Sequence, residues 1–215
     1  MLFGRDVSEY LLIIPPLLFS LTVHEFSHAL AAWLLGDQTA KDQGRLSLNP
    51  VRHLDPLGTL LILMSFFIGW AKPVPVNPRN FKSPGRDMAI VSAAGPAANL
   101  LLVLSAAALL HLAVSGNFFL ILPESISTPL GRMLYLSFFL NIGLCFFNLI
   151  PIPPLDGFGV MRIILPVKAR YFLDNNRLLF FLAIVILVWS GVVFKILQPI
   201  FELFADNLLP RELRG

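Results

Sequence analysis

Residues 7–35 read VSEYLLIIPPLLFSLTVHEFSHALAAWLL, an apolar stretch that carries His24, Glu25 and His28 in its second half. At 1.5 Å per residue, this stretch is long enough to cross a bilayer as one helix. On a helix, His24 and His28 lie one turn apart on the same face, so both imidazoles can bind one zinc ion. Glu25 flanks that face and can act on a water bound to the zinc. The stretch therefore predicts a zinc hydrolase site inside a membrane helix.

The composition of the chain is typical of a membrane protein. Of its 215 residues, 56% are hydrophobic and only 13% are charged, whereas a typical soluble domain has about 25% charged residues. The length allows roughly four or five spans with short loops, so we expect a single domain over residues 1–215. The net charge is +3. The Lys and Arg residues form no patch with interleaved aromatics, so the chain is not expected to bind nucleic acid.

The hydrophobic pattern predicts an all-α polytopic membrane protein with about four full transmembrane helices. The expected spans are residues 7–35, 88–114, 130–150 and 178–197. The single cysteine, Cys145, lies in an apolar run and is expected to be a small buried or lipid-facing side chain.

A shorter apolar stretch, residues 57–70, is expected not to cross the membrane. As a helix it would be about 21 Å long, less than the ~30 Å of the hydrocarbon core. AKPVPVNP follows it, where alternating Pro and Val forbid a helix and favour an extended edge strand. We therefore expect residues 57–77 to be re-entrant with a strand-like portion. GRLSLNP at residues 44–50 predicts a second short strand and turn.

The distribution of positive charge predicts the orientation. Loops 37–56, 71–87 and 166–177 contain most of the Lys and Arg residues, while residues 115–129 contain none. The positive-inside rule places the first three loops in the cytoplasm and the fourth outside. Both termini are then expected outside, and the predicted zinc site is expected toward the cytoplasmic side.

Asp156 is the best candidate for a third zinc ligand. Catalytic zinc normally takes three protein ligands and a water, and HEFSH supplies only two. Asp156 lies in NLIPIPPLDG at residues 148–157, where three prolines break a predicted span. Irregular backbone at membrane depth is tolerated only inside protein or beside a wet cavity. An aspartate there needs a partner, which a metal can provide. Gly157 would let the chain turn tightly behind the ligand.

The two motifs together resemble the site-2 protease family of intramembrane zinc metalloproteases, which pairs HExxH in an early transmembrane helix with NxxPxxxLDG in a later one. Here the motifs are HEFSH at residues 24–28 and NLIPIPPLDG at residues 148–157. GPAAN at residues 95–99 and GWAKPVPVNP at residues 69–78 are further matches. The chain is similar to the compact bacterial or archaeal branch, because it lacks an inserted PDZ domain and a CBS domain.

The resemblance implies that His24, His28 and Asp156 bind one zinc ion per chain and that Glu25 is the general base. It also implies that the substrates are other membrane proteins. These would be cleaved within or near a transmembrane segment, in the bilayer of a prokaryotic cell. In the family, the asparagine that matches Asn148 is thought to help hold the substrate backbone. The oligomeric state is not predicted.

Val74 and Val76 are further candidates for substrate contact. They are spaced to point to one side of an extended strand. Such an edge can pair with an unwound substrate as an added strand. The alternative is that the segment packs permanently against residues 44–50 as a structural hairpin.

Several polar residues also have a structural interpretation. His53 is expected to be a surface residue or a support for the site more often than a ligand. His111 is expected to be interfacial. Asn99 is expected to hydrogen-bond between helices, and Asn148 could bond to carbonyls freed by the proline break.

The sequence also allows two other functions. A metal-ion or solute transporter would use buried His and Asp side chains to bind a passing cation near the bilayer midplane. That alternative leaves Glu25 without a proton-transfer role and predicts an inverted repeat, which the sequence lacks. An inactive scaffold that binds membrane partners is the third hypothesis, and the intact HEFSH argues against it.

Overall fold

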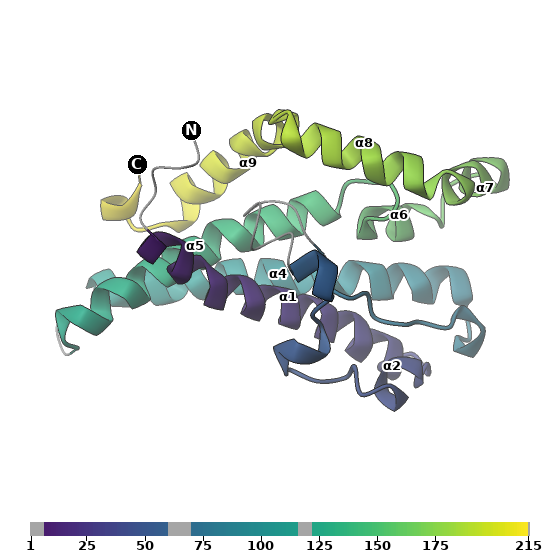
Figure 1. The fold of residues 1–215 in the computed structure, drawn as a ribbon, viewed down its shortest axis with the longest axis horizontal. Coiled ribbons are helices and arrows are strands. Elements are labelled where there is room, and N and C mark those ends of the chain that lie inside the picture. The colour runs from purple at the N-terminus through teal and green to yellow at the C-terminus, as the bar shows by residue number, and fades with distance from the viewer. Residues whose placement is uncertain (1–6, 60–69, 116–121, 215) are drawn as a thin grey trace.

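The computed structural model describes residues 7–59, 70–115 and 122–214. Long helices run alongside one another in the direction of the longest axis of the molecule (Figure 1). The helices are α1 (Val7–Leu34), α2 (Thr39–Asp42), α4 (Pro84–Ser115), α5 (Glu124–Asn148), α6 (Asp156–Met161), α7 (Val167–Asn175), α8 (Arg177–Trp189) and α9 (Val192–Leu208). Three short 3-10 helices are η1 (Pro50–Arg52), η2 (Pro78–Asn80) and η4 (Arg211–Leu213).

Three of the described helices are long and apolar enough to cross a membrane. They are the part of α1 from Leu11 to Leu34, α4 and α5. Each corresponds to an expected span, although α4 and α5 begin four and six residues earlier than expected. The prediction of a mostly helical membrane protein is thereby confirmed.

The region of the fourth expected span, residues 178–197, is not one helix. α8 ends at Trp189, and Gly191 takes a left-handed φ of 75° before α9 begins at Val192. Glycine adopts that conformation without the steric cost that a Cβ would impose. α7 and α8 together meet the criterion for a span, but their axes are bent by 70°. The count of four full spans therefore depends on treating broken helices as one crossing.

α4 packs against both α1 and α5, and these three helices form the centre of the fold (Figure 1). Small residues at a membrane helix interface let two backbones approach closely. The buried small residues of α4 are Ala89, Gly95, Ala98, Ala106, Ala107 and Ala113. Toward the far end of α4, a hydrophobic cluster joins Val103 and Leu110 to Phe138 and Ile142 of α5 and to Leu209.

The expected strands are not formed among the described residues. Leu54 and Ala71 make an isolated antiparallel bridge, and residues 72–77 have no regular structure. Residues 44–50 also lack a strand, and η1 begins at Pro50. Prolines at 73 and 75 cannot donate to a ladder, so the single bridge cannot extend. Residues 60–69, which belong to the stretch 57–77 expected to be re-entrant, lie outside the described part of the chain.

Asp37 ties the segment before η2 to the end of α1. Its carboxylate is fully buried and accepts hydrogen bonds from the backbone N–H of Asn77 (2.8 Å), the amide of Asn80 (2.7 Å) and the backbone N–H of Thr39 (3.1 Å). Burial alone would raise the pKa of Asp37, but the hydroxyl of Thr39, which also donates to this carboxylate, and the three donors above hold it below its ordinary value. The carboxylate thus fixes residues 77–80 beside α1, directly after the segment that carries Val74 and Val76.

Candidate metal centre

α1 presents two histidines to the interior of the helix bundle. His24 and His28 are one turn apart, and 5% and 8% of their surfaces are exposed. Their ring centroids are 4.7 Å apart, and the two Nε2 atoms are separated by 3.1 Å. The helical spacing thus places both nitrogens at one point, as the sequence predicted.

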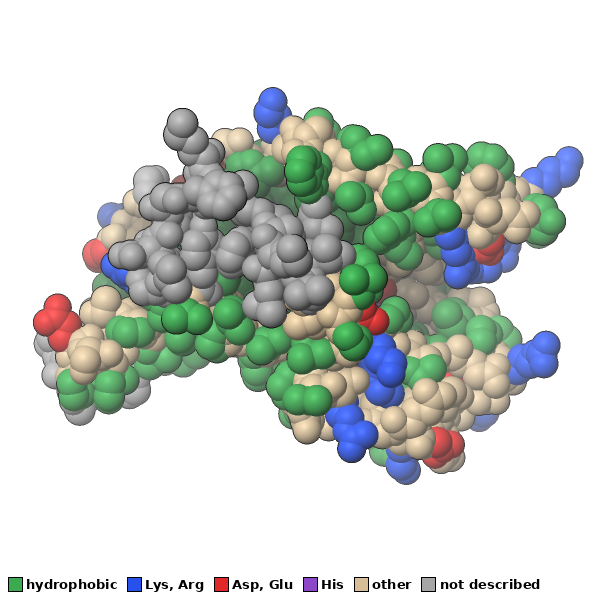
Figure 2. All heavy atoms as spheres, viewed as in Figure 1, with side chains coloured by type: hydrophobic (Ala, Val, Ile, Leu, Met, Phe, Trp, Pro, Cys, Tyr) green, Lys and Arg blue, Asp and Glu red, His purple; other side chains and the backbone are tan. Residues whose placement is uncertain are grey.

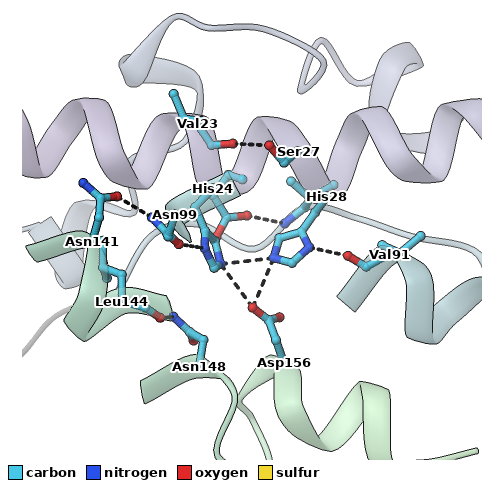
Figure 3. A network of polar contacts seen from close by, with 12 residues as sticks. Val23, His24, Ser27, His28, Val91, Asn99, Asn141, Leu144, Asn148 and Asp156 are labelled. Carbon is cyan, nitrogen blue, oxygen red and sulfur yellow. Dashed lines mark hydrogen bonds and ion pairs between the residues drawn. The ribbon is translucent and has the colours of Figure 1, made fainter. Parts of the chain in front are cut away.

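Asp156, which is far from the two histidines in the sequence, reaches the same point in the fold. α5 ends at Asn148, the prolines that follow prevent a helix, and α6 begins at Asp156. A Cβ at Gly157 would overlap the carbonyl of Leu149, so the turn behind Asp156 requires glycine. Asp156 Oδ2 lies 3.2 Å from Nε2 of His24 and 3.3 Å from Nε2 of His28. Figure 3 shows the three side chains converging.

The three donor atoms have the spacing of a metal site. Zinc bonds of about 2.0–2.1 Å in a tetrahedron place neighbouring ligand atoms about 3.3 Å apart. The observed separations of 3.1, 3.2 and 3.3 Å therefore match one face of such a tetrahedron. His24, His28 and Asp156 form a group that could hold a metal ion, the only such group in the described residues.

The hydrogen bonds around the triad also fit a cation. Nδ1 of His28 lies 2.7 Å from the carbonyl of Val91, and Nδ1 of His24 lies 2.6 Å from Oδ1 of Asn99. An imidazole that donates from Nδ1 has only a lone pair at Nε2. Asp156 Oδ2 is itself buried without a hydrogen-bond donor. Three buried lone pairs that face one another are repulsive unless a cation lies among them, so the residues fit the group that the motif implies.

α4 passes close enough to support the triad because of Gly95. A Cβ at this position would lie 2.5 Å from Nε2 of His28 and 2.6 Å from Cε1 of His24. Real Cβ atoms do not approach heavy atoms so closely. Glycine therefore leaves the space that the donor atoms and an ion would share, which gives the GPAAN stretch a role in the site.

Comparison with known proteins identifies relatives over almost the whole chain. A Bacillus subtilis protein named "Putative zinc metalloprotease YwhC" is 39% identical over 212 residues, which are 95% of this chain and 91% of that protein. A Mycolicibacterium smegmatis protein named "Putative zinc metalloprotease Rip2" is 32% identical over 186 residues, 85% of this chain and 68% of that protein. The Rip2 protein of Mycobacterium tuberculosis strain Erdman is 32% identical over 199 residues, 86% of this chain and 72% of that protein.

The chain belongs to this family of zinc metalloproteases. Zinc is therefore its cofactor, and His24, His28 and Asp156 are positioned to bind the metal. No family model matches the metalloprotease, and no solved structure matches it significantly.

Glu25 lies beside the triad of the metalloprotease, with 9% of its surface exposed. Its Oε2 accepts a hydrogen bond from the backbone N–H of Val74 at 3.1 Å. Arg45, which is 5% exposed, donates to the carbonyls of Lys72 (2.5 Å) and Pro73 (3.2 Å) and so holds the residues before Val74. Burial lowers the pKa of Arg45, and the negative charge of Glu25 acts in the opposite direction. Glu25, Arg45 and the segment of residues 72–77 are thus joined by hydrogen bonds into one unit.

The remaining predicted residues lie around this unit. Asn148, the last residue of α5, donates to the carbonyl of Leu144 at 2.8 Å, one turn earlier in its own helix and not one of the carbonyls freed by the proline break. Val76 packs against a cluster of Ala32, Phe81 and Val91. The side chain of Val76 therefore has a packing partner within the protein.

Two other histidines of the metalloprotease are outside the triad. His53 is not a surface residue: only 1% of it is exposed, and its Nε2 lies 2.6 Å from the carbonyl of Ser47. Its own carbonyl accepts from the N–H of Lys72 at 2.8 Å, so it supports the segment. His111 is exposed at the far end of α4, 3.1 Å from the carbonyl of Leu208.

Sequence reasoning missed Arg45 and Asn141. In the sequence, Arg45 is one of several cations in the loop 37–56, and nothing in its local sequence indicates burial. Asn141 is fully buried and donates hydrogen bonds to α1 and to its own helix. It lies seven residues, or about two turns, before Asn148, so both fall on one face of α5. A polar side chain at that spacing inside an apolar span was the available signal.

Proposed function

We propose that this metalloprotease works within the membrane as a compact site-2 protease, cleaving peptide bonds in or near transmembrane segments of other membrane proteins. One observation carries the proposal: two of the three residues of the metal triad, His24 and His28, lie midway along an apolar helix that is long enough to span a membrane. The spanning part of α1 begins at Leu11 and ends at Leu34. His24 is therefore on the order of 15–20 Å of helix from either end. A substrate bond must reach that depth.

The chemistry that we propose needs only the groups at this point. A bound zinc ion would supply Lewis acidity, polarising a carbonyl and lowering the pKa of water. His24, His28 and Asp156 hold the ion. Glu25 accepts the proton of the attacking water and passes it to the leaving amide nitrogen. The hydrogen bond from Val74 orients the carboxylate for both transfers.

Substrate contact is proposed for Val74, Val76 and Asn148. Lys72 and Val74 each precede a proline, which favours extended backbone at both positions. In an extended chain, the N–H groups of residues two apart point to the same side. The N–H of Val74 points at Glu25, and no described residue accepts the N–H of Val76. An unwound substrate could pair with this edge, and the carbonyl oxygen of the Asn148 amide, which accepts from none of the described residues, could accept from the substrate backbone.

The orientation that we propose places the metal centre toward the cytoplasm of a bacterial cell. Most of the Lys and Arg side chains visible in Figure 2 lie at the end of the molecule that carries α2 and α7. Among the other described residues in this view, many of the side chains at the surface are hydrophobic. The positive-inside rule assigns the basic end to the cytoplasmic side. The relatives that establish the family are bacterial.

The test uses purified protein with a set of single-span substrates, with and without a zinc chelator. We expect cleavage that the chelator abolishes and zinc restores. His28→Ala and Asp156→Ala should each lose zinc and activity. His111→Ala and Asp174→Ala, outside the site, are the matched controls and should retain one zinc per chain. Cation transport into vesicles without any cleavage would overturn the protease assignment, and unchanged zinc content in both site variants would overturn the ligand assignment.

A further inference from the structure

A line of buried amide side chains connects His24 to α5. Asn99 Oδ1 on α4 lies 2.6 Å from Nδ1 of His24, and the Nδ2 of Asn99 donates to Oδ1 of Asn141 at 2.8 Å. Asn99 and Asn141 are both fully buried. Figure 3 shows this line reaching away from the metal triad toward α5. Two amides with no access to water must satisfy each other.

The orientation of the Asn141 amide is fixed by a group that can only accept hydrogen bonds. Nδ2 of Asn141 donates to the backbone carbonyl of Ser137 at 2.8 Å and to Oγ of Ser20 at 2.8 Å. A backbone carbonyl has no hydrogen to donate. Turning the Asn141 amide over would bring its oxygen against that carbonyl, so the nitrogen must face Ser137. The oxygen of Asn141 must then face Asn99.

The orientation of each amide determines which atom of the next group must donate and which must accept. Because Asn141 offers an oxygen, Asn99 must offer its nitrogen to Asn141 and its oxygen to His24. A carboxamide oxygen accepts, so Nδ1 of His24 carries the proton and Nε2 carries the lone pair. His28 has the direct version of the same arrangement, since its Nδ1 faces the carbonyl of Val91 at 2.7 Å.

We propose that Asn99 and Asn141 are positioning residues that select the metal-binding tautomer of His24. The carbonyl of Ser137 fixes the orientation of the Asn141 amide, and Asn141 in turn fixes that of Asn99. The proposal rests on the role of His24 as a zinc ligand put forward above. It reaches beyond that role, because Asn141 touches neither the ligand nor the metal position. Partners of the second nitrogen of a ligating histidine typically contribute 10- to 100-fold to metal affinity. The competing interpretation is that the amides only join α1, α4 and α5.

The experiment measures zinc affinity by chelator competition at fixed pH in detergent, with the visible spectrum of the cobalt-loaded protein as a second readout. Asn99→Leu should weaken zinc binding by roughly 10- to 100-fold. Asn99→Asp should retain most of the affinity, because the carboxyl oxygen that faces His24 still accepts from Nδ1, and the other oxygen can carry a proton and donate to Oδ1 of Asn141. Asn141→Leu should weaken binding by about 10-fold, at the lower end of the same range, since the freed amide of Asn99 can turn over.

The double variant separates the two interpretations. A carboxylate accepts whichever way it turns, so it needs no orienting partner. In the Asn99→Asp background, Asn141→Leu should therefore have no further effect on zinc affinity. If the amides only joined the helices, Asn141→Leu would weaken zinc binding or the fold equally in both backgrounds, and the proposal would be wrong. Ser20→Ala is the matched control and should bind zinc normally, because the carbonyl of Ser137 remains.

His24→Ala distinguishes failure of this proposal from failure of the ligand assignment. If His24→Ala loses zinc while Asn99→Leu and Asn141→Leu bind it as tightly as the unmodified protein, only the positioning role of the two asparagines is wrong. If His24→Ala also binds zinc normally, the ligand assignment itself is wrong. Should Asn99→Leu not fold, Asn99→Asp and the Asn141 variants still decide the outcome.

Discussion

The backbone N–H of Val74 donates a hydrogen bond to a carboxylate oxygen of Glu25, with 3.1 Å between nitrogen and oxygen, although the two residues are 49 positions apart in the chain. Buried Arg45 holds the two carbonyls that precede Val74. A segment that lacks regular structure therefore sets the position of the carboxylate that we propose as the general base. The segment is part of the site and not merely a connection between helices.

Val74→Pro should remove this donor while keeping an apolar side chain. A hydrogen bond to a charged group contributes about 1.5–3 kcal/mol. We therefore expect the turnover of a short, unfolded peptide to fall by roughly 10- to 100-fold. Val74→Ala keeps the N–H and should lose much less. The measurements are peptide turnover and zinc content; a joint loss of zinc and expression in Val74→Pro would show that the segment is needed for the fold instead.

Val76→Pro tests whether the same segment presents substrate. The N–H of Val76 has no acceptor among the described residues, so removing it should not disturb the contact with Glu25. We expect slower cleavage of transmembrane substrates and little change with a short, unfolded peptide. Val76→Ala, which keeps the N–H and trims the side chain that packs on Ala32 and Phe81, controls for lost packing. Equal effects of both variants on both substrates would contradict pairing at this edge.

Glu25→Gln should separate metal binding from chemistry. The glutamine has nearly the same shape and can still accept from Val74, but it cannot take a proton from water. We expect full zinc content and a loss of proteolysis greater than the roughly 10²-fold usual for general acid–base catalysis. Glu202→Gln, on the exposed surface of α9, is the matched control. Cleavage at a near-native rate by Glu25→Gln would remove this residue from the mechanism.

The metal triad was predictable because its signals are local. His24 and His28 are related by the helical repeat alone, and Asp156 follows a proline break that ends a span. The spans were predictable for a similar reason, since length and hydropathy decide them. The boundaries shifted where helices begin at Pro84 and Glu124, before the hydrophobic residues start.

The parts that were missed depend on contacts between distant segments. The burial of Arg45 follows from carbonyls 27 and 28 residues away, and that of Asn141 from groups on α1 and α4. The expected strands failed because the prolines that favour extended backbone also remove the donors that a ladder needs. The break at Gly191 was hidden inside an apolar run, where hydropathy alone carries no information about backbone direction.

Asp37→Asn should destabilise the protein in a pH-dependent way. The carboxyl has an ordinary pKa of 3.8 and a lower one in the folded protein. The folded state therefore binds fewer protons near this pKa, and the stabilisation is complete above about pH 4 and is lost as the pH falls through the folded pKa. We expect a loss of about 1.5–3 kcal/mol at pH 7.

The free energy of unfolding in detergent should be measured for Asp37→Asn at pH 7 and again at the lowest pH that leaves the unmodified protein folded. The difference from the unmodified protein should shrink on acidification. Asp42→Asn, an exposed carboxylate on α2, is the control and should differ little at either pH. A difference that stays constant with pH would show that Asp37 is not ionised when it makes these hydrogen bonds.

The orientation in the membrane can be checked with single cysteines in a Cys145→Ser background, which removes the buried native thiol. Gln43 and Arg86 are exposed near one end of the helix bundle, and Ser125 is exposed at the start of α5 near the other end. Because α4 runs between these ends, Arg86 and Ser125 must lie on opposite sides of the membrane, and Gln43 shares the side of Arg86 when residues 57–77 are re-entrant. Applied to intact cells, an impermeant thiol reagent should label Ser125→Cys and spare Gln43→Cys and Arg86→Cys. The reverse pattern would place the metal centre toward the outer face, and labelling of Gln43→Cys together with Ser125→Cys, with Arg86→Cys spared, would mean that residues 57–77 cross the membrane.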